Sequence, residues 1–149
     1  MAVLNQSSAT TKVKLIDARG PRFSAVITTL VLASALVTQS AVLIALQLVV
    51  FAIGAFAGPA KTPYAFLFKK FVKPRLKGAV PTEDARPPQF AQSVGLIFAV
   101  VALAGSLLSI PALFTVAVGF ALFAAFLNAA FNFCLGCEIY LLGLRAIKN

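Results

Sequence analysis

Long hydrophobic runs, interrupted at a few polar positions, dominate the chain. Two segments carry almost no charge: residues 23–60, which are 38 positions long, and residues 87–137, which are 51 positions long. About 20 helical residues cross the hydrocarbon core of a bilayer, so each segment is long enough for two crossings. Polar residues or a proline interrupt the segments at 38–40 and 109–111, where we place turns. The pattern predicts an all-α integral membrane protein with four transmembrane helices.

A short motif stands before each hydrophobic segment. Residues 17–23 read DARGPRF and residues 84–90 read DARPPQF, which gives five identities in seven positions at an offset of 67. We interpret the chain as one membrane domain, residues 1–149, with a tail (1–16) and two repeated helical hairpins (17–78 and 84–149). Their expected relation is a pseudo-twofold axis along the membrane normal. The alternative is coincidence, because Arg and Pro both favour helix starts at membrane interfaces.

The charged residues of these motifs are expected at the level of the lipid head groups. If the two halves face each other across the axis, Asp17 pairs with Arg86 and Asp84 pairs with Arg19. The alternative is that these four side chains meet lipid phosphates instead.

The basic residues predict the orientation. All 13 Lys and Arg residues precede position 23, lie between 61 and 86, or follow position 144, and none lies in the two predicted turns. The positive-inside rule then places the N-terminus, the central loop and the C-terminus in the cytoplasm, with the protein in a bacterial inner membrane. An even number of crossings agrees with this. The net charge of +9 therefore requires no nucleic acid as a partner.

Residues 62–73 hold much of the positive charge in a predicted interfacial helix. Thr62 is expected to cap it, Pro63 to occupy its first turn and Pro74 to end it. One face would carry Tyr64, Leu67, Phe68, Phe71 and Val72, and the other Lys69, Lys70 and Lys73. Each lysine would contribute on the order of 1 kcal/mol toward binding anionic lipid. A basic docking surface for an acidic protein is the alternative. A second interfacial helix is expected after the second hairpin.

The only two cysteines, Cys134 and Cys137, form a Cys-x-x-Cys motif. No strand pattern accompanies it, so a thioredoxin fold is excluded. Residues 112–144 would form about 50 Å of straight helix, which is too long for one untilted crossing, and a break near Asn132 is expected. With Asn132 as the N-cap of the restarted helix, Cys134 lies in the first turn. There the helix dipole and free amides stabilise a thiolate.

Three interpretations of the cysteine pair remain open. In the first, Cys134 is a catalytic nucleophile, Cys137 resolves the mixed disulfide, and Glu138 assists proton transfer. In the second, the cysteines are small residues that allow helices to pack. In the third, they bind metal such as Cu(I). Asn128 and Asn132 are four positions apart on one helix face, which we expect to meet another helix or a substrate.

Other chemistry is limited by composition. The chain has no histidine, which excludes haem ligation by histidine and a Ser-His-Asp triad. It also has no Gly-rich phosphate loop. We expect no cofactor and assign no metal ligand beyond the open Cu(I) interpretation of the cysteine pair, since a closed zinc or iron-sulfur site would need ligands from a second chain.

Five stretches of the chain resemble a known family. They read DARGPRFSA (17–25), KTPYAFLF (61–68), VKPRL (72–76), RPPQFAQSVGL (86–96) and NAAFNFCLGCEIYLL (128–142). In these, the chain resembles the bacterial membrane family filed as domain of unknown function 4395, in its actinobacterial form. The resemblance implies a small four-span membrane protein, with Cys134 and Cys137 in the family's C-terminal motif.

The resemblance supplies no reaction, but it directs the functional expectation. Association with thioredoxin-like and rhodanese-like neighbours implies a membrane thiol-disulfide or sulfur-transfer role with such a cytosolic partner. The alternative is a non-enzymatic membrane subunit, scaffold or small transporter with structural cysteines. A homodimer is expected for so small a bundle.

Overall fold

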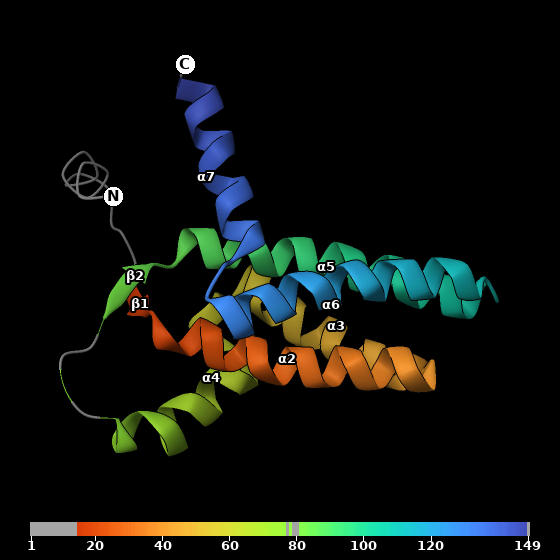
Figure 1. The fold of residues 1–149 in the computed structure, drawn as a ribbon, viewed down its shortest axis with the longest axis horizontal. Coiled ribbons are helices and arrows are strands. Elements are labelled where there is room, and N and C mark those ends of the chain that lie inside the picture. The colour runs from red at the N-terminus through yellow and green to blue at the C-terminus, as the bar shows by residue number, and fades with distance from the viewer. Residues whose placement is uncertain (1–14, 77, 79–80, 149) are drawn as a thin grey trace.

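Four helices lie side by side in the fold. The computed structural model describes residues 15–76, 78 and 81–148, which are mostly helical. The four are α2 (Arg19–Thr38), α3 (Ala41–Phe56), α5 (Arg86–Leu107) and α6 (Pro111–Phe131), as Figure 1 shows. α2 packs mainly against α6, and α3 packs mainly against α5. Their shared core includes Leu32, Ile44, Ala102, Phe114 and Val118.

Three of these helices have the length and apolar composition of a membrane crossing: α2, α5 and α6. α3 is also apolar but has only 16 residues. Both predicted turns are confirmed, since α2 ends at Thr38 and α3 begins at Ala41, and the second turn lies between α5 and α6. Gln39 and Ser109 adopt left-handed backbone angles there, with φ of 53° and 60°.

A small antiparallel β-ribbon lies at the opposite end from these turns (Figure 1). Its strands are β1 (Leu15–Asp17) and β2 (Thr82–Asp84), and Ile16 pairs with Glu83 at its centre. The expectation that the chain has no strand was therefore wrong. Each strand has three residues, which is too short to produce a recognisable alternation of polar and apolar positions.

The two DAR motifs each form an internal ion pair. The carboxylate of Asp17 accepts hydrogen bonds from Nε and Nη2 of Arg19 at 3.0 and 2.9 Å, and also from the Arg19 backbone amide. Asp84 accepts the same three types of bond from Arg86. The predicted pairs between motifs, Asp17 with Arg86 and Asp84 with Arg19, were wrong. An aspartate at the end of a strand can bond the amide two residues later, and this brings its own arginine within reach.

The lysine-rich segment is helical but changes its pitch. After η2 (Pro59–Lys61), it consists of α4 (Pro63–Leu67), a π-helical turn η3 (Phe68–Val72) and η4 (Lys73–Arg75). Thr62 caps α4 as predicted, because its hydroxyl accepts a bond from the Ala65 amide at 3.2 Å.

The predicted apolar face of this segment is only partly correct. Tyr64 and Phe68 are buried, whereas Leu67 and Phe71 are exposed. The π-turn starts at Phe68 and has more residues per turn than an α-helix, so it moves Phe71 away from the expected face, whereas Leu67 precedes the π-turn. Phe68 packs against Phe23 of α2, with 5.6 Å between ring centroids.

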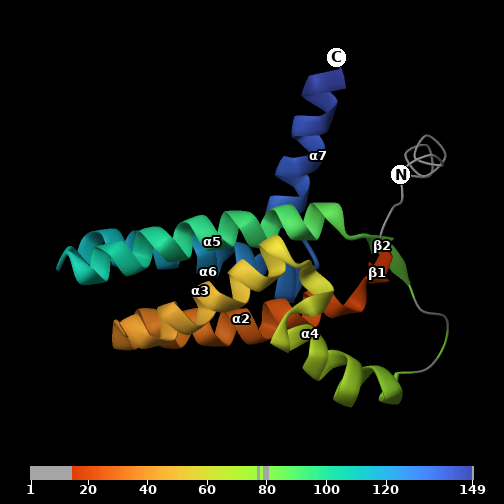
Figure 2. The ribbon, with the colours of Figure 1, turned by 180° about the vertical axis from the view of Figure 1, so that it is seen from behind.

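The last helix, α7 (Leu135–Lys148), leaves the direction of the bundle (Figure 2). It starts at the same end of the molecule as the ribbon and α4. Its main contacts are with α5. The cysteine pair therefore lies at the end where the ribbon, α4 and α7 meet.

Candidate functional site

The chain breaks near Asn132, as the length argument predicts. α6 ends at Phe131, and Asn132 adopts a left-handed conformation with φ of 53°. Its backbone amide donates to the carbonyl of Asn128 at 3.1 Å. Asn132 is therefore the residue that ends α6, and its predicted role as the N-cap of the next helix was wrong. Asparagine serves in both positions, because its side chain caps helices and its backbone tolerates left-handed angles.

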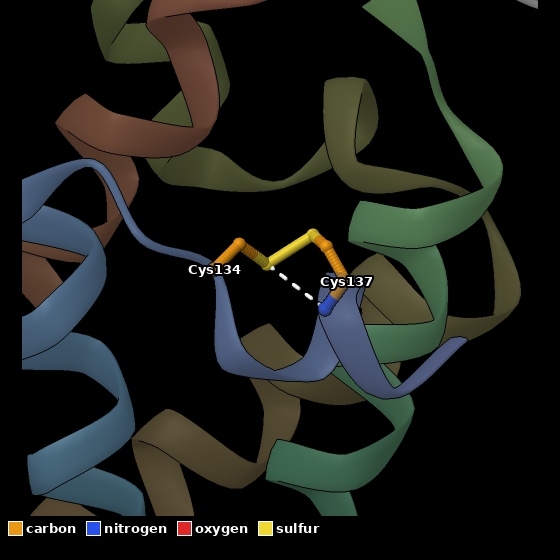
Figure 3. The surroundings of a disulfide bond; sticks show 2 residues. All are labelled: Cys134 and Cys137. Carbon is orange, nitrogen blue, oxygen red and sulfur yellow. Dashed lines mark hydrogen bonds between the residues drawn. A yellow bond between two sulfur atoms is a disulfide. The ribbon is translucent and has the colours of Figure 1, made fainter. Parts of the chain in front are cut away.

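Cys134 takes the capping position at the start of α7 (Figure 3). Its carbonyl accepts the Glu138 amide at 3.0 Å, which is the first helical hydrogen bond. Its Sγ atom accepts a bond from the Cys137 amide at 3.2 Å. Amides at a helix start favour negative charge, so this geometry favours the thiolate form of a reduced Cys134. The predicted proximity of Cys134 to a helix start is present, with Cys134 itself as the cap.

The two cysteines are joined in a disulfide, with 5.1 Å between their Cα atoms. They are partly buried. The bond closes across the first turn of α7, where both sulfur atoms face away from the turn in Figure 3. The structure thus contains the oxidised form of a dithiol whose two members are close enough to exchange between forms.

Gly136, between the two cysteines, holds α7 against α5. A Cβ atom at Gly136 would lie 2.7 Å from Cβ and 2.8 Å from Cα of Ala91. These distances are shorter than van der Waals contact, so only glycine allows this approach. Phe90 and Tyr140 reinforce the same contact, with 5.5 Å between ring centroids.

A cavity of about 550 Å³ adjoins the disulfide. Cys134 and Cys137 form part of its wall, and it continues inward to Phe51, Phe98 and Ala121. Residues of α2, α3, α5, α6, α7 and both strands contribute to it. A volume of this size is typical of small-molecule sites in proteins, which are about 300–1,000 Å³.

Most of the predicted site residues near the motif share this cavity. Asn128, Asn132, Glu138 and Asp84 line it together with the cysteines. Glu138 is exposed. Asp17, Arg19 and Arg86 are not among the lining residues, nor are the three lysines.

Each of the three predicted binding lysines makes its own contact. Lys69 Nζ donates to the carbonyl of Ala60 at 3.1 Å. Lys70 Nζ lies 5.8 and 5.5 Å from the ring centroids of Phe66 and Phe71. Lys73 Nζ lies 3.6 Å from Oδ2 of Asp17. Lys73 therefore links the lysine-rich segment to the ribbon.

Two charged lining residues, Arg22 and Glu83, were missed by sequence analysis. The Nε atom of Arg22 donates to the carbonyl of Ala129 at 3.1 Å, which ties the start of α2 to the end of α6. Glu83 lines the cavity from strand β2, which pairs with β1. Neither had a local signal, because Arg22 meets a carbonyl 107 positions away and Glu83 depends on the unpredicted strand pairing.

The carboxyl groups of the ribbon differ in acidity. The pKa of Glu83 is raised by burial and by the charge of Asp84. Hydrogen bonding to Arg19 lowers the pKa of Asp17 to about 2. Burial opposes a similar effect at Asp84, but the hydrogen bonds from Arg86 lower its pKa overall. Glu83 is therefore the ribbon carboxyl that most readily takes up a proton.

Fold and site together define a helical protein with membrane-length apolar helices and a Cys-x-x-Cys disulfide at one end of the bundle. In the described part of the chain, no group of three or more His, Cys, Asp or Glu residues is arranged to hold a metal ion. The family described as Domain of unknown function (DUF4395) matches residues 16–145, and the chain belongs to this family. No curated protein and no solved structure is significantly similar to the chain.

Proposed function

We propose that this is a multi-pass protein of the bacterial inner membrane that exchanges electrons through the Cys134–Cys137 couple. The observation that carries the proposal is the position of the disulfide: Cys134 caps α7 and its Sγ atom accepts the Cys137 amide. Both cysteines also face a cavity. Packing alone does not require a disulfide, nor does it require the cysteines to line a cavity of this size.

The exchange is a two-electron reaction. A thiolate of the partner attacks Sγ of Cys134, the Cys134–Cys137 bond breaks, and Cys137 leaves as a thiolate that takes up a proton. A second thiolate of the partner then releases reduced Cys134 and carries away the new disulfide. The helix start stabilises Cys134 as the thiolate, which makes it the better leaving group. The same steps in reverse oxidise the dithiol.

A thioredoxin-like partner suits this chemistry, because its Cys-x-x-Cys motif supplies both thiolates. A rhodanese-like partner with one reactive cysteine would form the mixed disulfide, and another thiol would then have to release it. The proposal places the exchange on the cytoplasmic side, where such proteins meet the membrane. The basic residues support this side, since Arg22, Lys70 and Arg145 belong to α2, the lysine-rich segment and α7, which gather at the disulfide end. Positive charge of this kind favours the cytoplasmic face.

The duplicated hairpin is part of the proposal, and the ribbon supports it. Ile16 pairs with Glu83, the residue 67 positions later, and Asp17 pairs with Thr82, the equivalent of Leu15. Two equivalent strands that pair in this register have a twofold axis through their central residues. The main helix contacts fit the same twofold relation. The first helix of each hairpin packs on the second helix of the other, since α2 packs on α6 and α5 packs on α3.

The proposal also includes a fourth crossing by α3. Its 16 residues span about 24 Å, a little less than the hydrocarbon core of about 30 Å. Ser40 before the helix and the turn after Phe56 supply the remaining length. Local thinning of the bilayer accommodates a short helix at modest cost.

A trapping experiment tests the exchange. We expect the Cys137→Ser variant, expressed in cells, to accumulate a mixed disulfide on Cys134 that reducing agent releases. The matched controls are Cys134→Ser and the double variant, which keep the protein but remove the attacking sulfur. A Cys137→Ser protein with no more adduct than the double variant would show that the couple is structural. The scaffold function would then be the better account, with Gly136 as the reason for the motif.

A further inference from the structure

Aromatic and small apolar residues line much of the cavity beside the disulfide, and polar side chains, among them Thr28 and Gln92, also contribute to its wall. Phe51 and Phe98 line it deep in the bundle, and Ala124 and other small residues leave its middle open. Arg22 and Asn128 line it near the disulfide. A ligand with an apolar body and hydrogen-bond acceptors at the end near the disulfide suits this lining.

Arg22 has donors to spare for such a ligand. Its guanidinium carries five N–H groups, and the bond to the Ala129 carbonyl uses the one on Nε. This bond fixes the group at the wall of the cavity. The Asn128 amide adds a further donor on the same wall. Carbonyl oxygens of a ligand would therefore be bound at the disulfide end.

The chemistry of the couple limits the class of ligand. A disulfide that repeatedly oxidises one partner is left as a dithiol each time, and it must be restored by a second partner that accepts two electrons. A cavity among apolar helices is accessible to a lipid-soluble carrier. We propose that this cavity binds the ring of a membrane quinone, which oxidises the Cys134–Cys137 dithiol; the inference rests on the proposed function.

The reaction balances without any other reagent. The two thiols give up two electrons and two protons as the sulfur–sulfur bond forms. The quinone takes up both, and its two carbonyl groups become the hydroxyl groups of the quinol. Glu83 stands at the cavity wall, and burial raises the pKa of its carboxyl. It is placed to pass these protons between the cavity and the water outside.

The test uses the full chain, purified in detergent, reduced and freed of reductant. A short-chain benzoquinone with every ring position substituted is added, because it cannot attach to thiols at the ring. Loss of quinone absorbance and loss of free thiols are followed together. We expect one quinone to be consumed per disulfide formed.

Two matched variants locate the reaction. Ala124→Leu fills the cavity, whereas Ala130→Leu adds the same side chain to an exposed position of α6. We expect Ala124→Leu to slow oxidation by the quinone about tenfold or more, and Ala130→Leu to leave the rate unchanged. Arg22→Gln should raise the quinone concentration needed for half-maximal rate. Equilibration with glutathione disulfide is measured in every variant, and all should retain it.

The outcomes separate the two proposals. If glutathione disulfide oxidises the dithiol but the quinone reacts no faster than with a free small dithiol, the quinone site is wrong and the exchange function stands. Equal quinone rates in Ala124→Leu and Ala130→Leu also overturn the site. If neither oxidant forms the disulfide, both proposals fail. If Ala124→Leu unfolds, the Arg22→Gln result decides.

Discussion

Cys134 has two structural roles at the start of α7. It forms half of the disulfide, and its sulfur accepts the amide of Cys137 as a helix cap. A serine retains an acceptor at this position, and an alanine does not. The cap can therefore be measured without the disulfide, in a chain that already carries Cys137→Ser.

In that background we expect Cys134→Ala to lose more local stability than Cys134→Ser. Loss of an N-cap costs about 1 kcal/mol, which is roughly a fivefold change in an opening equilibrium. Hydrogen exchange of the amides in residues 135–140 measures it, with the amides of α6 as an internal control. Equal protection in the two double variants would mean that Cys134 does not cap the helix.

The raised pKa of Glu83 predicts how the stability of the folded protein depends on pH. Its folded pKa lies above its ordinary value, so the folded state holds the proton more tightly than the unfolded state does. The contribution of Glu83 to the free energy of unfolding is fully present below its ordinary pKa, and it is lost as the pH rises through its folded pKa. We expect Glu83→Gln to remove this loss and to melt at a higher temperature than the natural protein at neutral pH.

The measurement is the melting temperature in detergent between about pH 4 and pH 8. The difference between Glu83→Gln and the natural protein should shrink as the pH falls, because protonated glutamate and glutamine have similar polarity. Parallel curves for the two proteins would contradict a raised pKa at Glu83.

At the scale of elements, Gly136 determines how closely α7 approaches α5. Gly136→Ala would place its Cβ 2.7 Å from that of Ala91, and relieving such a clash costs about 1–3 kcal/mol. We expect a lower melting temperature and faster labelling of the reduced Cys134, because α7 moves away from the cavity. Gly143→Ala is the control: nothing lies within 4 Å of its Cβ, so it should stabilise α7 by about 0.5–1 kcal/mol.

A second change in the same contact checks the cause. Ala91→Gly removes the methyl group that Gly136→Ala meets, although Cα of residue 91 still lies 2.8 Å from the new Cβ. Ala91→Gly by itself costs about 0.5–1 kcal/mol inside α5, so Gly136→Ala is compared in both backgrounds and should cost less stability in the Ala91→Gly protein. An equal cost in the two backgrounds would show that the effect arises elsewhere.

The elements also show which features a sequence can predict. The long helices and their turns followed from hydrophobic length, and the break near Asn132 followed from a segment too long for one crossing. The ribbon did not, because strands of three residues have no pattern of their own. Likewise, no residue pattern in the sequence marks the π-turn after α4, in which Phe68 is buried and Phe71 is exposed. The cavity depends on contacts such as Arg22 with Ala129, which no local pattern records.

In the whole molecule, the disulfide, the ribbon and the lysine-rich segment occupy one end, and both inter-helix turns occupy the other (Figures 1 and 2). If all four helices cross the membrane, as proposed, these two ends lie on opposite sides of it. If α3 lay along the membrane surface instead, the lysine-rich segment would remain on the same side as the turn before α3. The position of Lys70 relative to Thr38 therefore decides whether α3 crosses.

Labelling of single introduced cysteines measures on which side of the membrane each segment lies. The parent chain carries Cys134→Ala and Cys137→Ala, and the introduced changes are Thr38→Cys, Ser109→Cys, Lys70→Cys and Arg145→Cys. With a maleimide that does not cross membranes, we expect intact cells to label the first two, because both turns would face outward. The other two should react only after the cells are permeabilised, because their segments share the disulfide end. Labelling of Lys70→Cys and Thr38→Cys from the same side would remove the fourth crossing. Labelling of the pairs in the reverse order would keep four crossings but turn the disulfide outward, where a cytosolic partner cannot reach it.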